Sequence, residues 1–146
     1  MRISKDEYYL NIALAVAQRG TCLRRNYGAV IVKNDMIVGT GYSGSVRGHP
    51  NCCDVGTCKR QELGIPSGER YELCCSVHSE ANAIMSAGRE RCIGAEIFIA
   101  GIEMETGLIC DTTKPCDMCK RLIDNAGIIS TIVLTTNGSK VIDCIG

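Results

Sequence analysis

Two short motifs in this sequence have residue types and spacings suited to metal-assisted acid–base chemistry. They contain His78 and Glu80, and then Cys116 and Cys119. A catalytic zinc uses three protein ligands and keeps one position open, and one imidazole with two thiolates makes such a set. Glu80 lies two residues after His78, so its carboxylate can act beside the metal without binding it. There it can accept a proton from water and pass it to a substrate nitrogen.

Each motif alone has a simpler interpretation. A histidine before a helix is commonly a cap or a surface residue, and a C-x-x-C pair is often redox-active or structural. Their occurrence together, in the order H-x-E then P-C-x-x-C, favours a catalytic zinc centre. Two other interpretations stay open. One is a non-catalytic zinc- or nucleotide-binding module, which would have no use for Glu80, and the other is a thiol redox protein that uses Cys116 and Cys119.

The helices expected to position these residues begin at the motifs. Apolar residues at helical spacing, each time followed by a glycine, predict three helices at 6–19, 78–87 and 116–125. Runs rich in β-branched residues predict strands at 27–32, 36–42, 95–101, 130–135 and 141–142. We expect the first two strands to form an antiparallel hairpin with a loop at 33–35. A helical crossover makes the third and fourth strands parallel, and Asn137-Gly138 predicts a final hairpin.

Composition limits the function classes. The 146 residues suggest one domain, and the 16 basic and 16 acidic side chains balance. We therefore expect no polynucleotide partner, because a basic field is lacking. No apolar run has membrane-spanning length, and the first seven residues lack the apolar core of a signal peptide. These features predict a cytoplasmic protein with no membrane partner.

The segment 43–76 is long, irregular and rich in cysteine. A loop of this length needs its own support, and a second, structural zinc with four Cys or His ligands would provide it. The preferred ligands are Cys53, Cys58 and Cys74, with His49 or Cys52 as the fourth. The alternative is that these thiols are reduced and unliganded, and that Cys74 or Cys75 packs beside His78. The remaining cysteines are expected to be small buried hydrophobes: Cys22, Cys92, Cys110 and Cys144.

Arg24, Arg25 and Asn26 form a dense polar group just before the first strand. They have two interpretations, a solvated face or contacts to a substrate phosphate, whose oxygens match the arginine fork.

With these motifs the chain resembles the cytidine deaminase superfamily and, within it, the deoxycytidylate (dCMP) deaminase family. The resemblance covers about residues 6–134 and rests on H-S-E-A-N-A-I, P-C-x-x-C-K-R, T-C-L-R-R, G-A-V-I-V, G-Y-S-G, R-G, L-G-I-P-S-G-E-R and N-A-G-I. It implies an α/β fold, a three-layer α/β/α sandwich with a five-stranded mixed sheet, in a single deaminase domain at 1–146. The implied reaction is zinc-dependent hydrolysis of dCMP to dUMP and ammonia, within pyrimidine deoxynucleotide metabolism.

The resemblance also implies roles and partners. Glu80 is the catalytic acid–base, the Ser79 N–H binds the base, and Arg24 or Arg25 with Ser43 binds sugar and phosphate. The family implies a homo-hexamer with dCTP and dTTP as effectors. Tyr71 stands where the family often has His, which leaves the ligand set of the second zinc open. Ser43 and Leu134 stand where the family commonly has Asn and an aromatic residue near the base. These departures keep open the alternative of a zinc deaminase for another small cytosine-type base, nucleoside or nucleotide.

Overall fold

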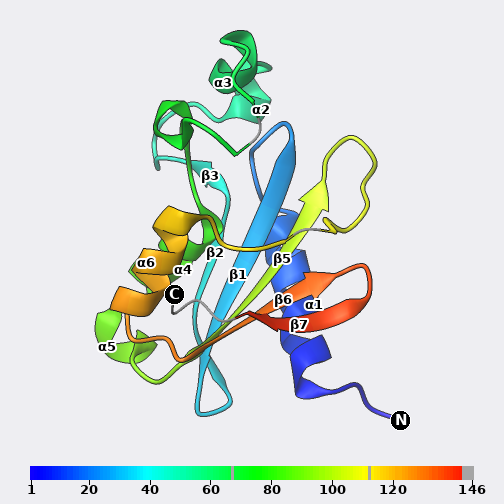
Figure 1. Cartoon of the computed structure of the whole chain (residues 1–146), viewed down its shortest axis with the longest axis vertical. Helices are drawn as coiled ribbons and strands as arrows, with labels where there is room; N and C mark the ends of the chain where they lie inside the picture. Colours follow the sequence, from blue (N-terminus) through cyan, green and yellow to red (C-terminus); the bar gives the residue numbers. More distant parts are fainter. Residues whose placement is uncertain (67, 112, 143–146) are drawn as a thin grey trace.

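A five-stranded mixed sheet forms the centre of the molecule (Figure 1). The computed structural model describes residues 1–66, 68–111 and 113–142. In spatial order the strands are β2 (Met36–Tyr42), β1 (Arg25–Lys33), β5 (Glu96–Glu103), β6 (Ser130–Thr135) and β7 (Gly138–Ile142). The β5–β6 pair is parallel and the other pairs are antiparallel. The predicted crossover, final hairpin and five-stranded mixed sheet are confirmed.

The β1–β2 turn is shorter than the sequence predicted. Lys33 pairs with Met36, so the loop has two residues and not three. Its residues, Asn34 and Asp35, both have positive φ, 52° and 60°. Asn and Asp tolerate this left-handed conformation, and two such residues make the turn whose twist matches a hairpin.

Helices cover both faces of the sheet. On one face lies α1 (Lys5–Ala17), which buries Leu10 and Ala13 against Val30 and Phe98. The other face carries α4 (Ser79–Ala87), α5 (Arg89–Cys92) and α6 (Asp117–Asn125). The side chains of β1 alternate between the two cores, as a strand buried on both faces requires. This arrangement confirms the three-layer sandwich, while the short α5 was not predicted.

Two glycines let helices approach the sheet closely. A Cβ at Gly28 would lie 2.1 Å from the carbonyl oxygen of Ala13 in α1. A Cβ at Gly41 would lie 2.3 Å from the amide nitrogen of Ala83 and 2.5 Å from the Ser79 carbonyl oxygen. The first turn of α4, which carries the H-x-E motif, is therefore seated directly on β2.

The long cysteine-rich segment projects beyond one end of the sheet (Figure 1). It contains short elements: β3 (Gly44–Ser45), α2 (Cys52–Val55), α3 (Lys59–Glu62), η1 (Tyr71–Leu73) and β4 (Ser76–Val77). β3 and β4 pair with each other, so the segment leaves and rejoins the domain at one place. We call residues 43–77 the insertion. No helix in the described parts of the chain is long and apolar enough to cross a membrane. Cys144, which was predicted to be buried, lies outside the described residues.

Candidate active site

Two helix starts bring the predicted zinc ligands together. His78 is the N-cap of α4, and Cys116 is the N-cap of α6. The Cys116 Sγ accepts a hydrogen bond from the Cys119 amide at 3.5 Å, so the first turn of α6 fixes both sulfurs on one side. Pro115, fully buried, precedes the cap and holds the start of the helix in place.

The spacing of the three ligand atoms fits zinc. The Nδ1 atom of His78 lies 3.5 Å from the Cys116 Sγ and 3.3 Å from the Cys119 Sγ. Ligands at ~2.0–2.3 Å from a tetrahedral zinc are separated by about 3.4–3.8 Å, so the distances suit this ion. Within the described residues this is the one group of three Cys, His or acidic residues whose ligand atoms all lie within 4.8 Å.

The electrostatics of the triad also favour metal binding. Hydrogen bonding from the Cys119 thiol and then from His78 lowers the pKa of Cys116 to about 4. The neighbouring Cys116 and burial raise the pKa of Cys119, and the bond to Cys116 raises that of His78. Cys116 is therefore the sulfur that more readily takes the thiolate form, which is the form that binds a metal.

The Glu80 carboxylate lies beside the triad without belonging to it. Its residue is 6% exposed, and the Ser79 hydroxyl donates a 2.5 Å hydrogen bond to its Oε1 atom. Its charge raises the pKa of Cys119, which places the carboxylate near the metal ligands. A buried, oriented carboxylate at this point is suited to general acid–base work.

A small cavity of about 110 Å³ opens at the triad. Its lining residues are Tyr27, Ser43, Tyr71, His78, Ser79, Glu80, Ile99, Lys114 and Cys116. The volume is well below the ~300–1,000 Å³ of pockets that bury a whole drug-sized ligand. The cavity therefore suits a single ring, with the rest of a larger substrate at its mouth.

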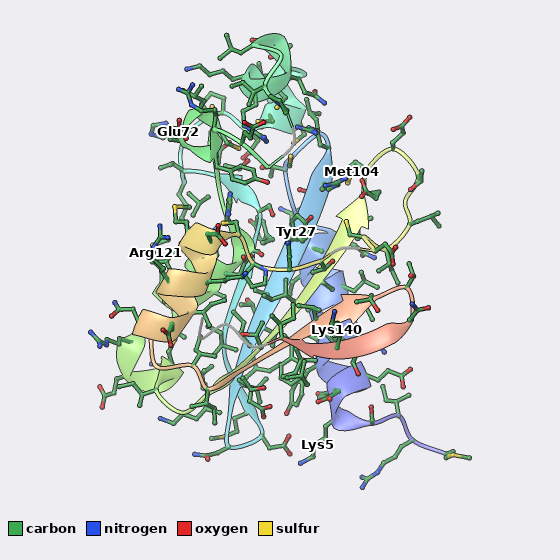
Figure 2. The ribbon with its side chains drawn as sticks, viewed as in Figure 1. Lys5, Tyr27, Glu72, Met104, Arg121 and Lys140 are labelled. Atoms are coloured by element: carbon green, nitrogen blue, oxygen red, sulfur yellow. The ribbon has the colours of Figure 1, made fainter. Side chains whose placement is uncertain are left out.

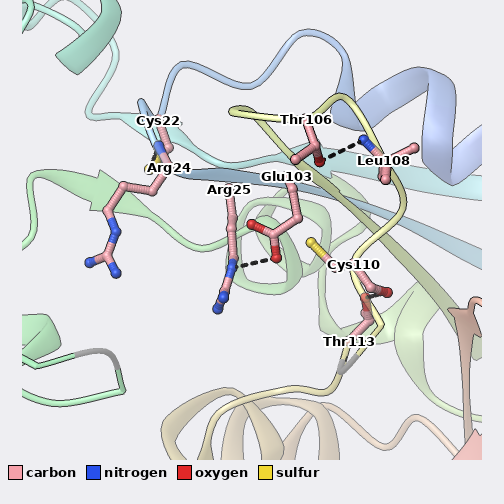
Figure 3. Close-up of polar contacts among 8 residues, drawn as sticks. All are labelled: Cys22, Arg24, Arg25, Glu103, Thr106, Leu108, Cys110 and Thr113. Atoms are coloured by element: carbon pink, nitrogen blue, oxygen red, sulfur yellow. Dashed lines mark hydrogen bonds and ion pairs between the residues drawn. The ribbon is translucent and has the colours of Figure 1, made fainter.

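Most of the predicted substrate ligands have other partners. Arg25 forms an ion pair with Glu103 at 2.8 Å (Figure 3). Asn26 is 1% exposed and uses its amide group to bond both the N–H and the carbonyl of Cys22, at 2.9 and 3.0 Å. Figure 3 shows the Arg24 guanidinium turned away from the Arg25–Glu103 pair. None of these three side chains lines the cavity.

Ser43 and Leu134 differ from the expectation in another way. Ser43 lines the cavity, but its hydroxyl accepts a bond from the Tyr27 amide at 3.1 Å and faces the Tyr27 carbonyl at 3.5 Å. It therefore serves first to join β1 to the end of β2. Leu134 packs with the core under α1, on the opposite face of the sheet from the cavity, so it does not lie near the base.

Four cavity residues were not predicted as ligands: Tyr27, Tyr71, Ile99 and Lys114. Two had usable sequence signals. Tyr27 is two residues before Ala29, on the face of β1 that meets α4 (Figure 2), and Lys114 directly precedes the P-C-x-x-C motif. Tyr71 stood out only as a departure from the family, and nothing local marks Ile99.

Four cysteines of the insertion and Cys22 lie in one region, and this set shares Cys52, Cys58 and Cys74 with the predicted ligands. The thiols of Cys22, Cys74, Cys75 and Cys58 all add to the effect of burial in raising the pKa of Cys52, so they lie in its neighbourhood, although among the described residues no three of these sulfurs lie within 4.8 Å of one another. By contrast, His49 and Cys53 are exposed. Backbone amides point at two of the sulfurs, from Arg24 to Cys22 at 3.5 Å and from Ser76 to Cys74 at 3.4 Å.

Comparison with known proteins identifies the family. The sequence profile described as "Cytidine and deoxycytidylate deaminase zinc-binding region" matches residues 3–136. The chain belongs to this family. It is accordingly a zinc-dependent hydrolytic deaminase, and the His78, Cys116 and Cys119 group fits the zinc that the family binds.

Several relatives within this deaminase family carry more specific names. A deoxycytidylate deaminase of Mycobacterium phage D29 is 39% identical over 128 residues, 84% of this chain and 88% of the phage protein. The deoxycytidylate deaminase of Schizosaccharomyces pombe is 34% identical over 92% of this chain, which spans only 38% of the yeast protein.

Solved structures agree with this family assignment. The dCMP deaminase of cyanophage S-TIM5, determined with dCMP and dUMP, has a TM-score of 0.64 at 26% identity and covers 91% of this chain and 82% of its own. The cytidine deaminase of Burkholderia pseudomallei shares the fold, with a TM-score of 0.62 at 15% identity over 97% of this chain and 94% of its own.

Proposed function

We propose that this enzyme converts dCMP and water into dUMP and ammonia. The observation that carries the chemistry is the buried Glu80 carboxylate, which lines a one-ring cavity beside the zinc ligands but is not one of them. The names of the relatives support dCMP as the substrate. When bound, zinc supplies a Lewis acid that lowers the pKa of water toward ~7.

The residues of the chain then have distinct tasks. Glu80 accepts a proton from the attacking water and transfers it to N3 of the cytosine as C4 becomes tetrahedral. It then takes the proton of the new C4 hydroxyl group and delivers it to the departing amine, which leaves as ammonia. Ser79 holds the Glu80 carboxylate in one orientation. The free N–H groups of the first turn of α4 are available to the base carbonyl, and Tyr27, Tyr71 and Ile99 enclose the ring.

We assign the substrate phosphate to Lys114, in place of Arg24 and Arg25. Among the described residues that line the cavity, Lys114 is the one lysine or arginine. Its side chain is exposed, and none of the ion pairs in the described chain involves it. Its backbone is fixed by the buried neighbours Thr113 and Pro115. An ammonium at the cavity mouth suits a phosphate that extends from an enclosed base.

A structural zinc in the insertion is part of the proposal, with a revised ligand set. Four of the five clustered sulfurs, those of Cys22, Cys52, Cys58, Cys74 and Cys75, would hold it. Backbone N–H groups that point at the sulfurs of Cys22 and Cys74 would help to orient them as ligands. Cys58→Ser should lower the zinc content from two ions per chain to one, and a wild-type protein with a single zinc would contradict the second site.

The remaining predictions are kept as part of this proposal. None of the ten described cysteines is joined to another in a disulfide, which supports a reducing compartment such as the cytoplasm. Residues 1–146 act as one deaminase domain. The homo-hexamer and control by dCTP and dTTP stay predictions from the resemblance.

Ammonia release tests the proposed reaction. Purified protein, with its zinc quantified, is given dCMP, CMP, deoxycytidine or dCTP in parallel. We expect dCMP to be the preferred substrate, and Glu80→Gln to keep zinc while losing at least 10²-fold in kcat. Preference for CMP or deoxycytidine would move the activity to another small cytosine-type substrate. If the zinc-loaded protein released no ammonia from any of these compounds, the result would favour the interpretation as a non-catalytic binding module.

Cys116→Ala is the second variant. We expect it to lose both the catalytic zinc and the activity. A metal-free variant that stayed active would contradict the zinc assignment and would reopen the thiol interpretation.

A further inference from the structure

A buried arginine in the insertion has no carboxylate partner among the residues that the structure describes. Arg60, in α3, is 5% exposed, and none of the ion pairs in the described parts of the chain involves it. Its Nε atom donates to the Glu69 carbonyl and its Nη2 atom to the Pro66 carbonyl, both at 3.0 Å. A buried charge is costly unless it is well bonded, so its location calls for a specific partner. These two bonds hold the guanidinium at a fixed place.

The third contact of Arg60 is an aromatic ring. Its guanidinium carbon lies 4.5 Å from the centroid of the Tyr71 ring, within the range of a cation–π interaction. Tyr71 follows Arg70, a non-glycine residue with φ of 53°, so the backbone turns sharply just before the ring. The loop from Arg60 to Tyr71 is thereby closed around the guanidinium.

The other side of Tyr71 meets the metal centre. Its ring lies 5.1 Å from the His78 ring at an interplanar angle of 88°, an edge-to-face contact. The same ring lines the cavity. Tyr71 therefore contacts Arg60, a zinc ligand and the substrate space together.

We propose that Arg60 and Tyr71 form a clamp through which the insertion fixes the His78 imidazole and one wall of the base pocket. Tyr71 is the residue that contacts the ligand ring, and Arg60 is a positioning residue that acts through Tyr71. The expected effect on zinc retention depends on the metal centre alone. The expected effect on the wall of the base pocket rests on the proposed function. The clamp makes retention of the catalytic zinc depend on a segment outside the sandwich.

Zinc release to a chromogenic chelator is the primary measurement, because it requires no turnover. Loss of a group that orients a zinc ligand commonly lowers metal affinity by about 10–100-fold. The energy of one aromatic pair corresponds to a change of about two- to tenfold in an equilibrium constant. We expect Tyr71→Ala to release the catalytic zinc about tenfold faster than wild type. Tyr71→Phe, which keeps the ring, should stay within threefold of wild type. The variants are made in the otherwise wild-type chain, so that the insertion stays intact, and metal released from the insertion is separated as a kinetic phase that all variants share.

Arg60→Met and the double variant test the direction of the coupling. If Arg60 acts through Tyr71, the double variant releases zinc no faster than Tyr71→Ala. Glu72→Gln is the matched control, since Glu72 adjoins Tyr71 but is exposed and pairs with Arg70 at the periphery of the molecule (Figure 2). It should behave as wild type.

Steady-state kinetics with dCMP is the second readout. Loss of the pocket wall should raise KM about tenfold in Tyr71→Ala, with a smaller change in kcat. Wild-type zinc release in Tyr71→Ala would overturn the clamp, and so would equal losses in Tyr71→Phe and Tyr71→Ala or additive effects of the two substitutions. If Arg60→Met fails to fold, the comparison of Tyr71→Ala with Tyr71→Phe tests the clamp by itself. Failure of the proposed substrate appears separately, as a wild-type protein that retains zinc but does not deaminate dCMP.

Discussion

Replacement of Lys114 by glutamine should convert a nucleotide deaminase into one that barely distinguishes dCMP from deoxycytidine. With zinc bound, the two positive charges of the ion are balanced by the thiolates of Cys116 and Cys119, and Glu80 contributes one negative charge. Lys114 is the cation that offsets it among the described cavity residues. Without it, a phosphate carrying nearly two negative charges must approach a site with a net charge of −1.

The size of the effect follows from the exposure of Lys114. A hydrogen bond to a charged group contributes ~1.5–3 kcal/mol. Solvent weakens an exposed pair, so ~1–2 kcal/mol is the better figure here. At ~1.4 kcal/mol per tenfold change, this corresponds to a rise in KM for dCMP of about 5- to 30-fold. The kcat for dCMP and the kcat/KM for deoxycytidine should change by less than about threefold.

The assay compares initial rates of ammonia release from dCMP and deoxycytidine at two ionic strengths. The KM for dCMP of the wild type should rise with salt more steeply than that of Lys114→Gln, because screening acts on the lost interaction. Lys114→Arg should keep most of the preference. Lys140→Gln, on the exposed edge strand β7 (Figure 2), serves as the charge-matched control. Equal losses for both substrates, or an unchanged KM for dCMP, would refute the assignment of Lys114 to the phosphate.

Three further substitutions test the framework of the site. Gly41→Ala should lower the free energy of unfolding by about 3 kcal/mol and lower kcat, because the new Cβ would meet the backbone of α4. An unchanged urea midpoint would contradict this close approach. Asn26→Ala should lower the free energy of unfolding by ~2–4 kcal/mol, because it leaves the N–H and the carbonyl of Cys22 without their side-chain partner. A raised KM with unchanged stability would instead show that Asn26 is a substrate ligand. The bond from Tyr9 to Asp35 raises the pKa of Tyr9 to about 12. The contribution of this bond to the free energy of unfolding is therefore complete below the ordinary tyrosine pKa near 10, and it is lost as the pH rises toward 12. Thermal unfolding between pH 10 and 12 should show a steeper loss of stability in wild type than in Tyr9→Phe, and equal slopes would remove this bond as the cause.

The sequence predicted what depends on short-range geometry. The H-x-E and P-C-x-x-C motifs place His78, Glu80 and Cys119 through the first turns of two helices, so a few residues determine how the ligands point. The helical periodicity likewise predicted α1, and the β-branched runs predicted the strands of the sheet. These patterns are set by neighbours in the chain and need little knowledge of the rest of the fold.

Substrate contacts could not be predicted in the same way, because distant partners compete for them. Arg25 is occupied by Glu103, 78 positions later, and Ser43 by the backbone of the adjacent strand. Neither partner is visible in the local sequence. The ring of Tyr71 reaches the site only because Arg60 closes a loop that has no regular pattern of its own. Residues in this loop are placed by single polar contacts rather than by periodic burial.

The order of the functional residues along the chain has a consequence for biosynthesis. His78, Glu80, Cys116 and Cys119 all precede β6 and β7. A chain that leaves the ribosome from its N-terminus therefore exposes the complete ligand set before the parallel partner of β5 has emerged. Metal captured at that stage would join the starts of α4 and α6, 38 residues apart at His78 and Cys116, and would tether α6 beside the nascent sheet. The ion would then guide the crossover that brings β6 alongside β5, as well as serving the finished enzyme.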